Sequence, residues 1–157
     1  MSTGSRPHIV VGIEGTHASE AALEWAVREA GLRGCPLTVV HAWSFDPVRD
    51  AGRTNEHAER RASACMIGAE VASAMRKVGV TPEIVEHSVH GSPAKVLVKA
   101  SAGAELLVLG RGHRSGMIDV LRHSVSADCV RNAASPVVVI PSSWVDSHAH
   151  GSLAASG

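Results

Sequence analysis

The sequence has no tyrosine and a single phenylalanine, and its three cysteines are far apart. So few aromatic rings leave little material for a surface that stacks single-stranded bases. Cys35, Cys65 and Cys129 form no C-x-x-C pair, so the sequence indicates neither a disulfide framework nor a zinc site. We expect three reduced thiols, mostly buried.

Net charge and long apolar runs are also absent. The 15 basic and 15 acidic side chains cancel, so no bulk field would attract nucleic acid or an anionic membrane. Segment 1–7 lacks the apolar run of a signal peptide, and no stretch approaches the roughly 18 apolar residues of a membrane helix. These absences predict a cytoplasmic protein with no nucleic acid or membrane partner.

The length of 157 residues and a hydrophobic fraction of 45% are typical of one domain with one core. Apolar, β-branched runs predict five strands, with amphipathic helices between them. The predicted strands are 8–13, 36–43, 81–89 near a sheet edge, 106–109 and 137–140. Strands that alternate with helices pair in parallel through right-handed crossovers. The sequence therefore predicts an α/β protein, a doubly wound three-layer α/β/α sandwich.

The helices have recognisable ends. We expect the first near Ser19, a third after Ser92 with Pro93 at its first position, and a fourth from Ser124 or Ser126. The second should span 55–78, with an apolar face made of Ala62, Cys65, Met66, Ala69, Ala72 and Met75. The predicted domain is 8–141, preceded by a flexible segment 1–7 and followed by a disordered tail 142–157.

A glycine-containing loop follows the fourth predicted strand. It reads LGRGHRSGMIDVLRHSVS over residues 109–126 and enters a helix, whose free N–H groups and dipole favour an anion. Gly110, Gly112 and Gly116 would let the backbone approach phosphate oxygens. Equally, these glycines would serve only the turn that leaves the strand. In a doubly wound sheet a ligand crevice opens where the strand order reverses, between the loops after strands one and four.

Three segments of this chain resemble the universal stress protein family: VVGIEGTHASEAALEWA, HGSPAKVLVKAS and LVLGRGHRSGMIDVLRHSVSADCVRNAASPVVVIP. The resemblance spans about residues 8–141. It implies a Rossmann-like, adenine-nucleotide α-hydrolase-like fold with a five-stranded parallel sheet of order 3-2-1-4-5, usually as a homodimer. One branch of the family binds ATP through a G-x2-G-x9-G-[ST] loop, and another branch lacks that loop.

The family motif falls on Gly110, His113, His123 and Ser124, so histidine replaces its second and third glycines. A side chain at His123 would crowd the point where the helix should meet a triphosphate. Alternatively, the two imidazoles would donate hydrogen bonds to phosphate, which would favour their charged forms. A third interpretation gives both histidines no role.

The resemblance places the rest of the nucleotide site at the ends of the first two strands. Glu14 stands where ATP-binding members carry Asp before Gly-Ser, and its carboxylate would contact the adenosine or, alternatively, cap the next helix. Val40 and His41 would wall a base pocket, although His41 also fits a satisfied core histidine. The predicted cofactor-binding residues are Ile13, Glu14, Gly15, Thr16, Val40, His41, Gly110, Gly112, His113, Gly116, His123, Ser124 and Val125.

We predict no catalytic or metal-binding residues. Ser124, His113 and Asp119 are the ingredients of a hydrolytic triad, but no G-x-S-x-G elbow is present. His148 and His150 lack a third ligand nearby. The favoured hypothesis is a homodimeric stress-response protein with an altered ATP site, loaded with Mg²⁺, that dimerises through the edge strand 136–140. The alternative is a nucleotide-free dimeric interaction module.

Overall fold

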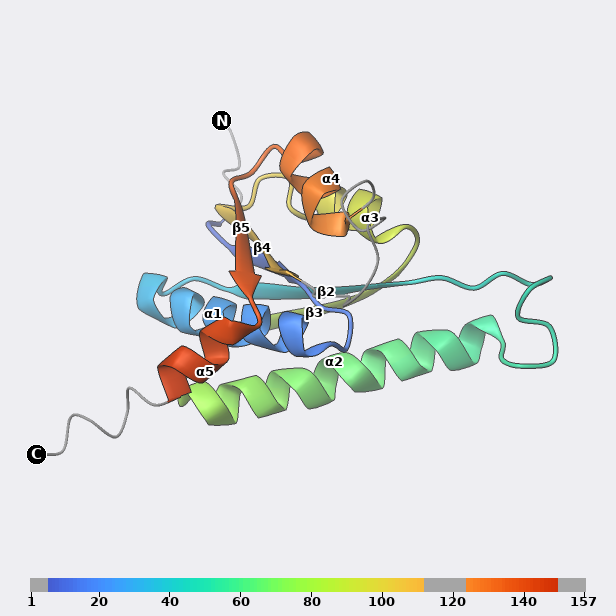
Figure 1. Cartoon of the computed structure of the whole chain (residues 1–157), viewed down its shortest axis with the longest axis horizontal. Coiled ribbons are helices and arrows are strands. Elements are labelled where there is room, and N and C mark those ends of the chain that lie inside the picture. Colours follow the sequence, from blue (N-terminus) through green and yellow to red (C-terminus); the bar gives the residue numbers. More distant parts are fainter. Residues whose placement is uncertain (1–5, 112–123, 150–157) are drawn as a thin grey trace, which may run out of the picture.

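The computed structural model describes residues 6–111 and 124–149, and Figure 1 shows how their strands and helices are arranged. In chain order the elements are β1 Ile9–Gly12, α1 His17–Arg33, β2 Leu37–Trp43, α2 Glu56–Val78, β3 Ile84–His90, α3 Pro93–Ala100, β4 Leu106–Arg111, α4 Val125–Asn132, β5 Val137–Pro141 and α5 Ser143–Ala149. The strand–helix alternation expected from the sequence is therefore present.

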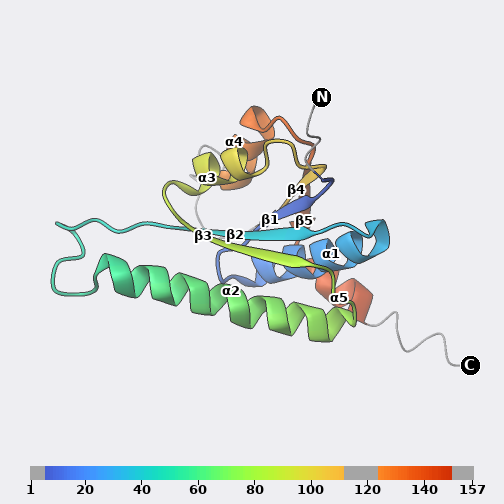
Figure 2. The same cartoon turned by 180° about the vertical axis from the view of Figure 1, so that it is seen from behind.

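The five strands form one parallel sheet of order β3-β2-β1-β4-β5. β1 lies at the centre, where Val10 is in register with Thr38 of β2 and Leu107 of β4. Helices α1, α2 and α5 cover one face of the sheet, and α3 and α4 cover the other (Figures 1 and 2). The predicted three-layer fold and its strand order are confirmed.

Each face of the sheet has its own core, because successive side chains of a strand point to opposite faces. Val11 of β1 packs in the core under α1 and α2, whereas its neighbour Val10 packs with Leu97 and Cys129 in the core under α3 and α4. All four residues of β1 are buried. This double burial explains the continuous apolar run from which the strand was predicted.

The buried face of α2 agrees only in part with the prediction, because Met66 and Met75 are half-buried against the core as expected but do not lie at its centre. Ser63, Ile67, Val71 and Ala74 face the sheet and are at most 3% exposed, whereas Ala62, Cys65 and Ala69 are exposed. Alanine tolerates either environment, so an alanine-rich helix gives a weak periodic signal, and the branched side chains at 67 and 71 are the better indicators. Cys65 is thus an exposed thiol, while Cys35 and Cys129 are buried as expected.

The expected disordered tail begins with a helix instead. α5 packs on α1, and Trp144 and Val145 lie against the core under α1 and α2. The Arg28 guanidinium lies 5.4 Å from the centre of the Trp144 ring, a distance at which a cation–π attraction contributes. One large aromatic residue therefore anchors a segment whose composition suggested disorder. Residues 150–157 and 1–5 lie outside the described part of the chain.

Within the described ranges, none of the helices has the length and apolar character needed to cross a bilayer.

Candidate functional site

The strand order reverses at β1, whose two neighbours are β2 and β4. β1 leads into α1 on one face of the sheet, and the next described helix after β4, α4, lies on the other face. The carboxyl edge of the sheet beside this reversal is where doubly wound folds bind their ligands. Of the predicted site residues, Gly112, His113, Gly116 and His123 lie outside the described residues.

The β1–α1 loop, residues 13–16, positions Glu14 at this edge. Thr16 is the N-cap of α1, and its side chain accepts a hydrogen bond from the Ser19 backbone N–H in a capping box. The Thr16 hydroxyl also donates to Glu14 Oε1 at 3.1 Å. The cap is therefore Thr16 rather than Glu14, and α1 begins at His17 rather than near Ser19. The Glu14 carboxylate is exposed, and its second oxygen has no hydrogen bond from the residues that the structure describes.

Gly110 near the end of β4 is needed for packing. A Cβ at this position would collide with the backbone carbonyl of Ala18 and lie 2.8 Å from the backbone nitrogen of Ser19. β4 therefore approaches the first turn of α1 too closely for any side chain. The first glycine of the family motif has a structural reason in this chain that does not involve a ligand.

The end of β2 is only in part what the sequence predicted. The Val40 side chain is fully buried in the core under α3 and α4, so it cannot form the wall of an open pocket. Its backbone carbonyl accepts a hydrogen bond from Ile13 N–H at 2.9 Å, which ties β2 to the β1–α1 loop. Val40 and Ile13 therefore shape the site through their backbones.

His41, the next residue of β2, belongs to a polar network that the sequence did not reveal. Its Nδ1 lies 2.7 Å from Ser63 Oγ of α2, and the Ser88 hydroxyl of β3 donates to Ser63 Oγ at 2.6 Å. Burial lowers the pKa of His41, and the negative charge of Glu14 opposes that shift. The one available signal was Ser63, a polar residue four positions before Ile67 on the buried stripe of α2.

The first turn of α4 faces the same edge. Ser124 is the N-cap, and its Oγ accepts a hydrogen bond from the Ala127 N–H at 3.0 Å. Of the two predicted starts, Ser124 is therefore correct. Val125 packs against the core under α3 and α4.

At the start of α3, by contrast, Ser92 occupies the N-cap position before Pro93 but makes no capping hydrogen bond with its side chain.

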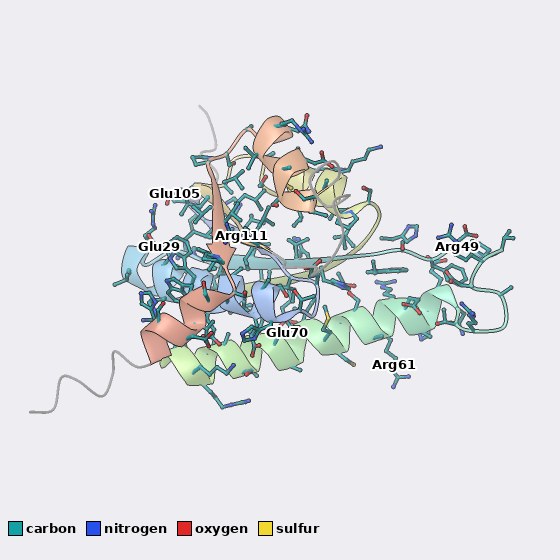
Figure 3. All side chains as sticks on the ribbon, viewed as in Figure 1. Glu29, Arg49, Arg61, Glu70, Glu105 and Arg111 are labelled. Atoms are coloured by element: carbon teal, nitrogen blue, oxygen red, sulfur yellow. The ribbon has the colours of Figure 1, made fainter. Side chains whose placement is uncertain are left out.

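Glu70 of α2 lies beneath the β1–α1 loop, between α2 and α1 (Figure 3). Its Oε2 is buried without a hydrogen-bond partner among the described residues. Burial and, to a smaller extent, the charge of Glu20 raise the pKa of Glu70. Its charged form therefore destabilises the fold at neutral pH.

We predict that Glu70→Gln stabilises the protein at neutral pH. A carboxyl whose pKa is raised by folding binds its proton more tightly in the native state, so its contribution to stability falls as pH rises from its unfolded value through its folded value. The gain from the substitution should vanish at pH values below the unfolded pKa. Urea unfolding at a series of pH values measures the difference in the free energy of unfolding between the variant and the unmodified protein. Glu86→Gln, on the exposed strand β3, is the control. A gain independent of pH would contradict the assignment.

A five-stranded parallel sheet whose strand order reverses at β1, with helices on both faces, defines a Rossmann-like α/β protein. The model of the universal stress protein family matches residues 6–141. The chain belongs to the universal stress protein family.

Two relatives and two solved structures illustrate the similarity. Universal stress protein Rv2005c of Mycobacterium tuberculosis is 35% identical over 153 residues, which cover 90% of this chain and 50% of the relative. A universal stress protein of Mycolicibacterium smegmatis is 31% identical over 142 residues, which cover 87% of this chain and 46% of the relative. The chain thus spans about half the length of the curated relatives that it matches.

The solved structures share the fold. The universal stress protein from Archaeoglobus fulgidus in complex with dAMP is 27% identical, with a TM-score of 0.61, over 88% of this chain and 99% of that one. A universal stress protein in complex with cAMP is 24% identical, with a TM-score of 0.67, over 88% of this chain and 98% of that one.

Proposed function

We propose that the crevice between the β1–α1 loop and the N-terminus of α4 binds an adenine nucleotide, ATP with Mg²⁺, in a stress-response protein. The observation that carries the proposal is the position of the Glu14 carboxylate and the capped α4 N-terminus at the carboxyl edge of β1 and β4. The similarity to the Archaeoglobus fulgidus protein, solved with dAMP, supports an adenine nucleotide as the ligand.

The described residues fit such a ligand. Ser124 Oγ accepts from Ala127 N–H and lies 3.3 Å from Ser126 Oγ, so its hydroxyl hydrogen can reach a phosphate oxygen when Ser126 is the donor in that contact. The other N–H groups in the first turn of α4 have no partner within the helix and point at the same place. Phosphates would sit at this helix and carry the Mg²⁺, which usually binds through phosphate oxygens and water. The adenosine would lie beside Glu14 and His41.

Binding rather than catalysis is the proposed activity, and the cytoplasm is the proposed location. Ser124 serves as a helix cap, and Ser63, which contacts the His41 imidazole, is 3% exposed and therefore closed to a substrate. Cys35, Cys65 and Cys129 are free thiols, which suits a reducing compartment.

We further propose that the chain forms a homodimer through β5. In the sheet of the described residues β5 is an edge strand paired with β4, and Val137, Val138 and Val139 are half-buried in the single chain. Pairing with the same strand of a second copy would cover an apolar edge that otherwise favours aggregation. Sedimentation equilibrium should give twice the chain mass of 16.3 kDa. A monomer at high concentration would rule this contact out.

We predict that ATP with Mg²⁺ raises the unfolding temperature of protein that has first been stripped of nucleotide. A ligand that binds only the folded state adds about 2.7 kcal/mol of stability at a concentration one hundred times its dissociation constant. Thermal unfolding at rising ATP concentrations measures the effect, and a titration with Mg²⁺ alone is the control. An unfolding temperature that does not respond to ATP would count against the proposed nucleotide site.

The nucleotide-free dimeric interaction module is the second candidate, and the observation in its favour is the pair of histidines at 113 and 123, where the family's ATP-binding motif has glycine. Such a module should be purified without adenine absorbance. A nucleotide-binding protein should carry adenine through purification and release it on denaturation.

A further inference from the structure

The β1–α1 loop rests on a methionine of α2. Gly15, inside this loop, has a φ of 75°, in the left-handed region that favours glycine. A Cβ at Gly15 would lie 2.9 Å from Met66 Sδ, so the sulfur is in contact with the loop backbone. A side chain at position 15 would require Met66 to move.

Met66 lies between this loop and the interior. Its side chain is half-buried and packs against the core under α1 and α2. Glu70, one turn further along α2, reaches the same corner, with Oε1 3.8 Å from a Cβ at Gly15. Its other oxygen, Oε2, is buried and has no hydrogen-bond partner among the described residues. Met66 thus touches the loop backbone beside a carboxyl group, and its partial exposure lets a small oxidant reach it.

The loop that Met66 supports is held by a few hydrogen bonds. The Ser19 hydroxyl oxygen accepts from the backbone N–H groups of Glu14 and Thr16, each at 3.2 Å. Thr16 caps α1 and donates from its hydroxyl to Glu14 Oε1 at 3.1 Å. Gly15 lies between Glu14 and Thr16 in the chain, so a displacement of Gly15 would disturb both bonds to Ser19. The start of α1 therefore depends on what occupies the space beside Gly15.

We infer that Met66 is an oxidation site, and that its sulfoxide displaces the β1–α1 loop and loosens the start of α1. The oxidant is a peroxide. The sulfur lone pair attacks one oxygen of hydrogen peroxide, and the S–O bond forms as the O–O bond breaks. The other oxygen leaves as water with both hydrogens. Sulfur loses the two electrons that the peroxide gains.

The product differs from the thioether in shape and polarity. Oxidation adds an oxygen to the sulfur and converts a flexible apolar side chain into a polar one. The Gly15 backbone already touches the sulfur, and the Glu70 carboxyl group beside it is an acceptor that repels the sulfoxide oxygen when ionised. The sulfoxide and the loop can no longer share this corner, so the contact that supports Gly15 is lost. Methionine sulfoxide reductases reverse the reaction, which makes the contact a reversible switch.

The consequence for a ligand rests on the proposed nucleotide function. Glu14 belongs to that site, so a displaced loop should weaken ATP binding, by about tenfold if one hydrogen bond to the nucleotide is lost. The consequence for the loop itself depends on no nucleotide.

Peroxide treatment of the full chain tests the inference. Cys65→Ala is the starting protein, because the exposed Cys65 thiol would otherwise react as well. Mass spectrometry of peptides shows which methionines gain an oxygen. Oxidation of Met66 should lower the unfolding temperature by at least about 2 °C. It should also speed hydrogen exchange of the amides at 14–19 more than in the rest of α1, and methionine sulfoxide reductases should restore both values.

Met75 supplies the matched controls, because it is also a half-buried methionine of α2 that packs against the same core. Met66→Leu nearly conserves the volume and should protect the loop from peroxide, whereas Met75→Leu should not. Met66→Gln introduces a polar group at the same place without an oxidant. It should reproduce the faster exchange at 14–19, and Met75→Gln should not.

The inference would be overturned if Met66 stayed unoxidised while Met75 gained oxygen, or if Met66 sulfoxide left hydrogen exchange in the β1–α1 loop unchanged. A loss that Met66→Leu does not prevent would overturn it as well. ATP titration of the unoxidised protein separates the two proposals. If that protein fails to bind ATP but its loop responds to oxidation of Met66, the nucleotide function is refuted and the oxidation site stands.

Discussion

Gly110→Ala should destabilise the protein by about 3 kcal/mol or more, or prevent it from folding. The new methyl group would overlap the backbone carbonyl of Ala18 and approach the backbone nitrogen of Ser19 to 2.8 Å. A backbone group inside a capped helix cannot move away as a flexible side chain does. Relief would require β4 to separate from α1, and both pack on the central strand. Urea unfolding followed by circular dichroism measures the loss.

The matched control is Gly68→Ala in α2. A Cβ at Gly68 meets nothing within 4 Å, and alanine is the better helix former, so this variant should be stabilised by up to about 1 kcal/mol. Equal effects from the two substitutions would show that β4 does not approach α1 as closely as described.

Ile67→Ala should cost about 2 to 5 kcal/mol. Ile67 is 1% exposed and packs in the core under α1 and α2, so its truncation leaves a cavity between the long helix and the sheet. The same unfolding measurement applies. The prediction discriminates between the face of α2 found in the structure and the face expected from the sequence, because Ile67 is not on the expected face.

Cys65→Ala is the control on the other face of the helix. Cys65 is exposed, so its removal should change stability by less than about 0.5 kcal/mol. A large loss at Cys65 together with a small one at Ile67 would mean that α2 is rotated about its axis relative to the structure.

The fold was predictable because its strongest signals are local. A strand buried on both faces must be a continuous apolar run, as Ile9–Gly12 is, and parallel strands separated by helices leave few topologies. The strand order itself came from the resemblance to the family. The structure confirms both the three-layer sandwich and the 3-2-1-4-5 order.

The features that the sequence did not predict depend on tertiary contacts. The buried face of α2 is set by two branched side chains among many alanines, and α5 forms because Trp144 finds a place against α1 and the core. Neither contact leaves a periodic pattern. The cap at Thr16 was missed because Ser19, its partner in the capping box, is also a residue that starts helices.

The candidate site was likewise predictable where residue type and motif are informative, and not where tertiary contacts decide. Residue type and family motif pointed to Glu14, Gly110 and Ser124, and the structure places all three at the carboxyl edge of the sheet. The hydrogen bonds of Ser63 to His41 and to Ser88 join residues more than twenty positions apart, so no local spacing in the sequence predicts them. The packing role of Gly110 likewise depends on how closely α1 approaches β4.

The most direct test of the nucleotide site is a calorimetric titration of ATP with Mg²⁺ into stripped protein, beside a His113→Gly, His123→Gly double variant that restores the family loop. The proposal predicts saturable binding by the unmodified protein with one nucleotide per chain. Binding by the double variant alone would contradict it, because the histidines would then have closed the site, and the chain would act as a dimeric interaction module.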